Sequence, residues 1–230
     1  MVQFLMARAG GGHGGGGGGG HGGAGGAHGV PGQGGRTGIF GYIMMIVFIV
    51  VGSGVGIVGS IIIWKSKFAE KIINESEEMD PLWNMEQMKL NARSIFYRMQ
   101  DAWENRDMNS VKDIVTPELY EGYKEVLDGM KERGEKNILR EIDITDTSVI
   151  GCEDYKDDTK DRFIAYIKGT MLDYTILEQT GEIIQNPERT VQKFSDEYHF
   201  VRVDNQWHLE SIDNSVNLLK ILVARNYKEA

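Results

Sequence analysis

Three histidines in a glycine-rich segment near the N-terminus are the first side chains that could bind a metal. His13, His21 and His28 lie in a tract that holds 18 of the 30 glycines in the chain. Neutral imidazole is a common metal ligand. A glycine tract is not preorganised, so ordering it around an ion would oppose binding by several kcal/mol. We therefore expect a flexible, solvated tract over residues 1–38, and we predict no metal site and no cofactor.

The other residues that could carry chemistry are isolated in the sequence. Cys152 is the only cysteine, so it can neither form an internal disulfide nor build a zinc site alone. The carboxylates of residues 153–161 lack the glycine and terminal glutamate of an EF-hand loop, which favours a solvated turn. Strand alternation directs His199 and His208 away from their aromatic neighbours. We therefore predict no catalytic residue and no enzyme activity.

An uncharged apolar run, residues 39–64, follows the glycine tract and contains 26 residues. At about 1.5 Å per residue, a helix of this length spans about 39 Å, enough to cross a hydrocarbon core of about 30 Å. Gly54, Gly56 and Gly59 form a GxGxxG pattern within it. A dinucleotide site requires a strand before this pattern and a partly charged helix after it. The run therefore predicts one transmembrane helix and not a nucleotide site.

Small residues recur along the same run. Gly52, Gly56 and Ser60 are spaced four apart, which places them on one face of a helix. Ridges of this kind let transmembrane helices approach each other closely. The spacing is compatible with a homo-oligomer formed through the transmembrane helix, but glycine is common in such helices without a packing role, which is the simpler interpretation.

The charges that flank the run indicate its direction. Lys65, Lys67 and Lys71 follow it, whereas Arg36 alone precedes it closely. Positive charge accumulates on the cytoplasmic side, so we expect the N-terminus outside and the C-terminal domain in the cytoplasm. The start MVQFLMARA ends in an A-x-A pattern typical of signal-peptide cleavage, which agrees with export of the glycine tract.

The chain after Lys65 is strongly acidic. It contains 22 of the 25 Lys and Arg but all 34 Asp and Glu, a formal net charge of −12. Nucleic-acid-binding domains neutralise phosphates with basic patches, so we predict no nucleic-acid partner. The same charge disfavours broad attraction to anionic lipid headgroups.

Periodicity over residues 80–213 predicts one α+β domain. Apolar residues recur at helical spacing after Asp80-Pro81 and after Thr116-Pro117, which are favourable helix starts. After Gly134 the period becomes two, and alternation predicts four strands over residues 138–152, 163–177, 191–203 and 207–212. Helices followed by strands favour helices packed on one face of an antiparallel sheet.

Two further segments flank the predicted domain. Residues 65–79 are charged and are expected to form a helical stalk that leaves the membrane. Residues 214–230 contain several apolar positions, which predict a final helix over Val216–Tyr227.

The last two predicted strands carry a recognisable pattern. Phe194–Asp213, FSDEYHFVRVDNQWHLESID, contains aromatic-x-Phe-x-Arg, a turn, and Trp-x-Leu-x-x-Ile. This pattern resembles the closing strands of the Tim44-like domain family, with Tyr198 where the usual aromatic residue is Trp. The segments Thr180–Ile184 and Val115–Leu119 are also similar to the family. The resemblance covers residues 80–213.

The resemblance implies a cone-like fold, in which helices and a curved sheet enclose an apolar pocket. It also implies a bacterial plasma-membrane protein that presents this domain to a protein partner or a lipid. The implied process is protein translocation or membrane-protein handling. The candidate pocket residues are aromatic and could equally be plain core: Trp103, Tyr123, Phe200 and Trp207.

Two other functions stay open from the sequence. A structural subunit of an envelope or secretion assembly would place the domain outside the cytoplasm. An enzyme that uses the cone pocket would need an inward carboxylate or histidine with a tuned pKa. The side of the membrane on which the domain lies distinguishes the first alternative from the cytoplasmic binding module.

Overall fold

The computed structural model describes the backbone of residues 39–229 and the side chains of residues 58–229. The chain divides into two compact units, with the boundary between Ser60 and Ile61. One continuous helix, α1 (Ile39–Glu77), runs through this boundary. Its backbone is therefore helical over the whole predicted transmembrane segment, residues 39–64, and over most of the predicted stalk.

Among residues 58–229, no helix is both long and apolar enough to cross a membrane. Residues 39–57, which make up most of the predicted transmembrane helix, lie outside that range. Gly52 and Gly56 of the predicted packing ridge lie outside it as well, and Ser60 is exposed. The histidine tract also falls outside the described residues.

The charged stalk predicted over residues 65–79 is helical to Glu77, but it does not stand free of the domain. Its buried side chains recur at helical spacing, and they either pack in the domain core or make polar contacts with the domain. They are Ile62, Lys65, Ala69, Ile72, Ile73 and Ser76. The Ser76 hydroxyl donates a hydrogen bond to Asp154, 78 residues further along the chain, at 2.6 Å. The stalk is thus a structural helix of the domain.

Helices α2 and α3, separated by a short 3₁₀ turn, follow α1. Helix α2 (Met85–Asn105) begins after Asn84, whose side chain accepts a hydrogen bond from the Gln87 amide at 2.9 Å. The 3₁₀ turn η1 (Met108–Val111) connects it to α3 (Pro117–Glu132), which Thr116 caps as predicted. The predicted start of the first helix at Asp80 is wrong, because Asp80 instead accepts from the Leu82 amide in a tight turn.

The described residues form a sheet of six strands, in place of the four predicted. The order is β5-β4-β2-β1-β6, with β3 paired to β2. All pairs are antiparallel except β1 with β6. The strands are β1 (Glu135–Asp154), β2 (Arg162–Leu177), β3 (Ile183–Gln185), β4 (Val191–Val203), β5 (Gln206–Asp213) and β6 (Asn226–Lys228).

The predicted C-terminal helix is corrected by the structure. Only α4 (Leu218–Val223) is helical, and the chain then becomes β6. Strand β6 forms because the Cys152 amide donates to the Arg225 carbonyl at 3.0 Å and to Asn226 Oδ1 at 3.1 Å. A backbone partner 74 residues away therefore decides the conformation of this end of the chain.

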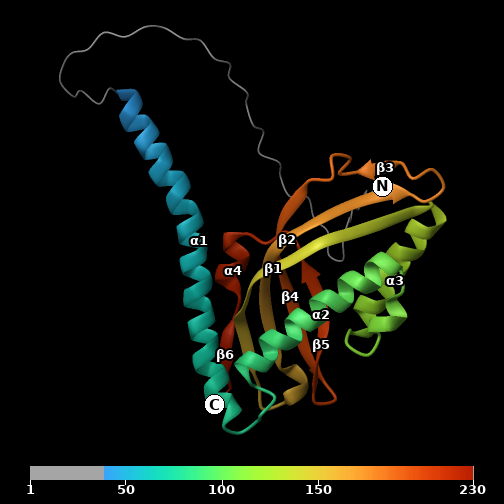
Figure 1. Ribbon diagram of the computed structural model, residues 1–230. Coiled ribbons are helices and arrows are strands. Elements are labelled where there is room, and N and C mark those ends of the chain that lie inside the picture. Colours follow the sequence, from blue (N-terminus) through green and yellow to red (C-terminus); the bar gives the residue numbers. More distant parts are fainter. Residues whose placement is uncertain (1–38, 230) are drawn as a thin grey trace, which may run out of the picture. The chain divides into compact units, whose positions relative to one another are not determined.

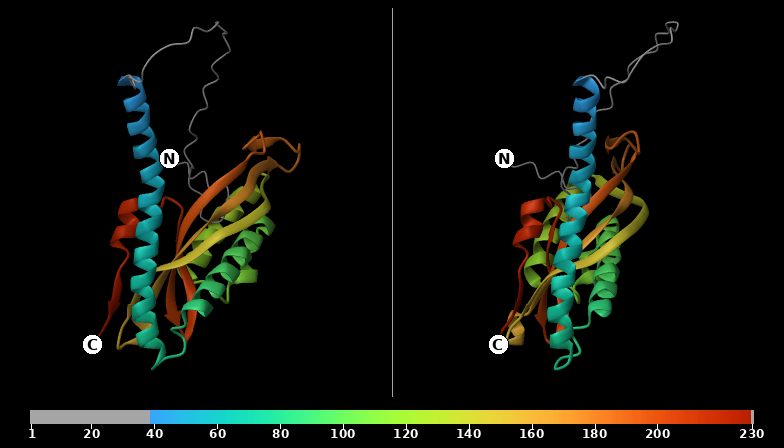
Figure 2. Two further views of the ribbon diagram at one scale, coloured as in Figure 1. Left: turned by 60° about the vertical axis from the view of Figure 1, so that its left-hand side comes forward. Right: turned by 90° about the vertical axis from the view of Figure 1, so that its left-hand side faces the viewer.

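The sheet curls, and α2 and α3 lie against its concave face (Figure 1, Figure 2). Phe96 of α2 packs on the rings of Phe194 and Tyr198 of β4, with centroids 5.3 and 5.7 Å apart. The opposite face is crossed by the segment that leads from β5 to β6. A Cβ at Gly151 would lie 3.3 Å from Ile164 and 3.5 Å from Ala224, which places the end of α4 on that opposite face.

Candidate functional site

An apolar pocket of about 250 Å³ lies between α2 and α3. Trp103 in the last turn of α2 supplies one wall. The ring of Tyr123 meets it edge-on, with centroids 5.6 Å apart and planes at 74°. The remaining lining comes from α3, which contributes Glu118, Leu119, Gly122 and Val126.

Gly122 lines this pocket from the middle of α3, where alanine would be the better helix former. It is exposed, and a Cβ added at this position would meet no heavy atom within 4 Å. Position 122 therefore faces open space at the mouth of the pocket.

The indole N–H of Trp103 is a buried hydrogen-bond donor. The side chain is 1% exposed, and among the described residues nothing accepts a hydrogen bond from its indole Nε1. An unsatisfied buried donor costs roughly 1–3 kcal/mol, and Trp N–H groups usually find an acceptor when buried.

The connection between the two helices fixes this geometry. Arg106 ends α2 in the left-handed region, with φ of 54°, which is uncommon for a residue other than glycine. Its guanidinium holds both oxygens of Glu178, at 2.7 and 2.9 Å, and donates to the Glu135 carbonyl at 3.0 Å. The turn after α2 is thereby tied to the first residue of β1 and to the residue that follows β2, which lie side by side at the open end of the β1–β2 hairpin. Helix α3 then folds back beside Trp103.

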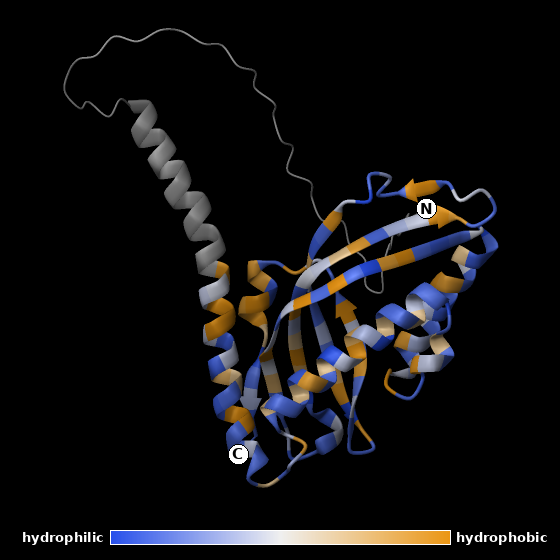
Figure 3. Cartoon of the chain, viewed as in Figure 1, coloured by the Kyte–Doolittle hydropathy of each residue, from blue (hydrophilic) through white to orange (hydrophobic). Residues whose placement is uncertain are grey.

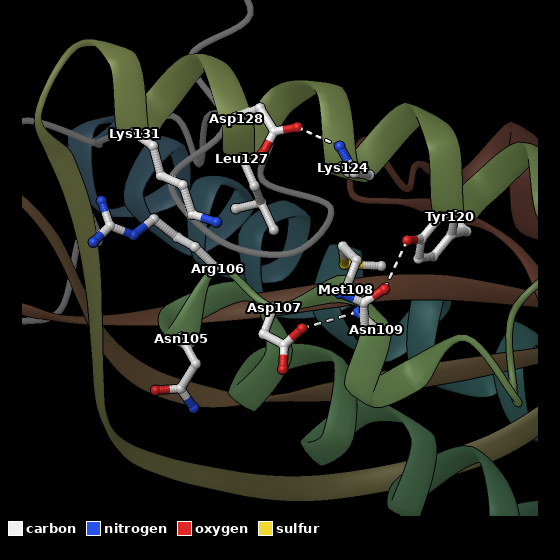
Figure 4. A pocket seen from close by; sticks show the side chains of 10 residues that line it. All are labelled: Asn105, Arg106, Asp107, Met108, Asn109, Tyr120, Lys124, Leu127, Asp128 and Lys131. Atoms are coloured by element: carbon white, nitrogen blue, oxygen red, sulfur yellow. Dashed lines mark hydrogen bonds and ion pairs between the residues drawn. The ribbon is translucent and has the colours of Figure 1, made fainter.

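A second, polar pocket of about 310 Å³ lies on the other flank of α3 (Figure 4). Tyr120 donates to Asn109 Oδ1 at 2.9 Å, and Lys124 pairs with Asp128 at 2.6 Å. That hydrogen bond lowers the pKa of Asp128. The full lining is Asn105, Arg106, Asp107, Met108, Asn109, Tyr120, Lys124, Leu127, Asp128 and Lys131. Of its five charged side chains, Lys124 and Asp128 pair with each other, and Arg106 pairs with Glu178 outside the pocket.

The four aromatic residues predicted to share a pocket separate into two groups. Trp103 and Tyr123 line the apolar pocket, whereas Phe200 and Trp207 belong to the packed core. Phe200 stacks on Phe163 with centroids 4.4 Å apart, and Trp207 meets the same ring edge-on at 4.8 Å. The pocket residues that sequence reasoning missed are Glu118, Leu119, Gly122 and Val126 of α3. Of these, Gly122 alone carried a signal, as a glycine inside a strong helical pattern.

The groups with potential chemistry lie elsewhere. Cys152 is buried, and burial raises the pKa of its thiol to about 12. The closest approach of His199 to an acid is 3.6 Å, from Nε2 to Glu197 Oε2. His199 pairs with Ile164 on the face opposite Phe200. Across residues 58–229, no three His, Cys, Asp or Glu side chains are grouped closely enough to hold a metal ion.

A curled antiparallel sheet, covered by helices that leave an apolar pocket between them, defines a small pocket-bearing α+β domain. The chain belongs to the Tim44-like domain family, whose model matches residues 69–214. The match begins inside α1 and ends just after β5, so it includes residues 69–79 of the segment that the sequence alone suggested was a stalk.

No curated protein matches the chain. Among solved structures, the intermembrane space region of the chloroplast protein ARC6, known from a crystal structure, is similar with a TM-score of 0.39 and 11% sequence identity. The match covers 55% of this chain and 97% of that one.

Proposed function

We propose that this protein is a single-pass, membrane-anchored binding module that presents its Tim44-like domain in the cytoplasm. The domain takes an apolar segment of a protein partner into the α2–α3 pocket, in protein translocation or membrane-protein handling. Membership of the Tim44-like family supports the process. The uncharged run over residues 39–64 supports the anchor.

The observation that carries the proposal is the apolar pocket of about 250 Å³ between α2 and α3, which Trp103 and Tyr123 line. A large apolar side chain of a peptide could enter a volume of this size. Because membership of the Tim44-like family points to protein translocation, we favour a protein segment over a lipid tail. We propose no catalytic role.

Photo-crosslinking from the pocket tests this proposal. Benzoylphenylalanine in place of Gly122 in the full-length chain is expected to capture a discrete protein in cells, because a side chain at this position meets open space. Glu125, exposed on the same helix and outside both pockets, is the matched control position. We expect adducts at least about 5-fold stronger from position 122, equivalent to roughly 1 kcal/mol of local preference.

A second substitution makes the crosslinking result specific. Val126→Glu places a charge in the apolar pocket and should abolish the adduct from position 122. Equal labelling from positions 122 and 125, or an adduct that Val126→Glu leaves unchanged, would contradict a role for the pocket. An adduct with phospholipid alone would favour the lipid alternative.

The orientation of the chain is tested separately. Lys65 is buried, so Lys67 and Lys71 are the exposed positive charges directly after the apolar run. We expect a green fluorescent protein fused after Ala230 to be fluorescent and an alkaline phosphatase fused there to be inactive, since both report a cytoplasmic C-terminus. Active phosphatase would overturn this orientation and favour a subunit of an envelope or secretion assembly.

A further inference from the structure

Seven large apolar side chains are exposed on two neighbouring elements of the domain. On α4, Leu219 is 73% exposed and Val223 is 77% exposed. We call the whole set the α1–α4 apolar surface; its members are Ile63, Trp64, Phe68, Leu218, Leu219, Leu222 and Val223. Exposed apolar groups that gather in one place mark a site of interaction more often than scattered single residues do.

Specific contacts hold the two elements together. The Lys65 amine of α1 donates to the Ala224 carbonyl at the end of α4, at 2.6 Å. Ile221 and Ala224 turn inward and are 2% and 6% exposed, so α4 is anchored by one side only. Both ribbon views place α4 beside α1, and Figure 3 shows hydrophobic colour on both at the same level. The other side of α4 has no cover among the described residues.

The position of this surface along the chain indicates what covers it. The uncharged run ends at Trp64, and the next residue, Lys65, is the one that contacts α4. A chain that leaves a bilayer at Trp64 therefore leaves it beside α4. The exposed α1 residues, 63 to 68, extend over roughly 8 Å of helix axis, similar to the 5–10 Å depth at which amphipathic helices bury in a membrane interface.

The aromatic residues of the surface suit the same environment. Trp64 and Phe68 stack, with centroids 6.3 Å apart, and both rings are about half exposed. Trp is favoured at the boundary between headgroups and acyl chains. The positive charge within α4 pairs inside the domain, because Lys220 forms an ion pair with Asp213. The contact that α4 itself makes with the bilayer would thus depend on apolar insertion.

We propose that the α1–α4 apolar surface inserts into the interface of the bilayer that residues 39–64 cross, so that α4 is a second membrane contact of the domain. This inference rests on the membrane anchor of the proposed function. It assigns the lipid interface to the C-terminal segment and leaves the α2–α3 pocket for the partner. Two contact points would hold the domain at a set angle to the membrane.

Nitroxide labels at α4 test the proposal in the full-length chain, reconstituted in phosphatidylcholine and phosphatidylglycerol vesicles. The labelled variants are Leu219→Cys and Val223→Cys. Leu90→Cys on α2 is the control, because Leu90 is 57% exposed. The native Cys152 is 1% exposed and stays unlabelled. We expect labels at 219 and 223 to be reached by lipid-soluble oxygen and shielded several-fold from a water-soluble nickel chelate, relative to position 90.

Each alternative has its own result. Nickel access at 219 and 223 equal to that at 90 overturns the proposal. Shielding accompanied by spin–spin broadening that disappears on dilution with unlabelled chain also overturns it, because a second copy then covers α4. Shielding that is insensitive to salt supports apolar insertion.

Alkaline carbonate extraction of the same vesicles separates this inference from the proposed function. A chain that stays with the membrane but exposes 219 and 223 to water keeps its anchor and loses only the α4 contact. A chain that is extracted refutes the anchor and, with it, both proposals.

Discussion

Gly169→Ala is expected to destabilise the domain by roughly 3 kcal/mol or more. A Cβ at Gly169 would lie 2.1 Å from the Asp143 carbonyl oxygen and 2.9 Å from the Phe194 ring. The first contact is with backbone, which cannot rotate away. Strand β1 would have to leave β2 at a point where the register already shifts between Ile144 and Asp146.

The measurement is the thermal unfolding of the full-length chain in mild detergent, followed by near-ultraviolet circular dichroism. Gly122→Ala is the matched control, because a Cβ there meets nothing within 4 Å. It should be neutral or stabilise α3 by up to about 1 kcal/mol. A melting temperature for Gly169→Ala equal to that of the control would show that the strands move apart without cost.

Arg202→Met is expected to cost about 3–5 kcal/mol near neutral pH, because it leaves a buried carboxylate without its cation. Arg202, at the end of β4, is 8% exposed and Asp161 is 0% exposed. The guanidinium pairs with Asp161 at 3.0 Å, with Asp158 at 3.1 Å and also with Asp80. One side chain therefore joins the α1–α2 turn to the β1–β2 loop.

The stability lost in Arg202→Met should increase as the pH rises from about 5 to about 7.5. Burial raises the pKa of Asp161 to about 6, against the opposing hydrogen bonds from the Tyr155 amide and Arg202. A carboxyl whose pKa is higher in the folded state stabilises the fold fully below its unfolded pKa of about 4, and that contribution is lost as pH rises through about 6. Without Arg202, ionised Asp161 is still less favourable, so Arg202→Met should be more harmful at about pH 7.5 than at about pH 5.

Urea unfolding of both chains at the two pH values measures this effect. Arg162→Met is the matched control, because Arg162 pairs with Glu210 at 2.7 Å on the surface, with about half of each side chain exposed. It should cost less than about 1 kcal/mol at either pH. Adding Asp161→Asn to Arg202→Met should recover part of the stability. A loss that is equal at both pH values would exclude Asp161 as its cause.

Regular periodicity made the main elements of the domain predictable. The stripe from Met88 to Trp103 predicts α2, the Thr116-Pro117 cap predicts the start of α3, and alternation predicts β1, β2, β4 and β5. These signals are local, because one face of each element is buried whatever covers it. The boundary at Asp80 was wrong because Asp80 pairs with Arg202, 122 residues away, and a turn follows.

The C-terminal segment shows the limit of this reasoning. Residues 216–227 have apolar spacing that favours a helix, yet Asn226 and its neighbours pair with β1. In the same way, the sequence indicates that Lys65 is a positive charge flanking a membrane, but its side chain is buried and donates to the Ala224 carbonyl. In each case the partner is more than 70 residues distant, and nothing in the local sequence indicates it.

The sequence by itself determined the acidic balance of the domain, the uncharged run before it, the type of its principal elements and the family pattern in its last strands. Only the tertiary structure decided that Trp103 and Tyr123 line a pocket while Phe200 and Trp207 fill the core, and that α4 lies beside α1. The reason is physical. Local periodicity indicates that a face is buried, whereas the group that buries it, and any pocket that is left beside it, depend on how distant segments pack.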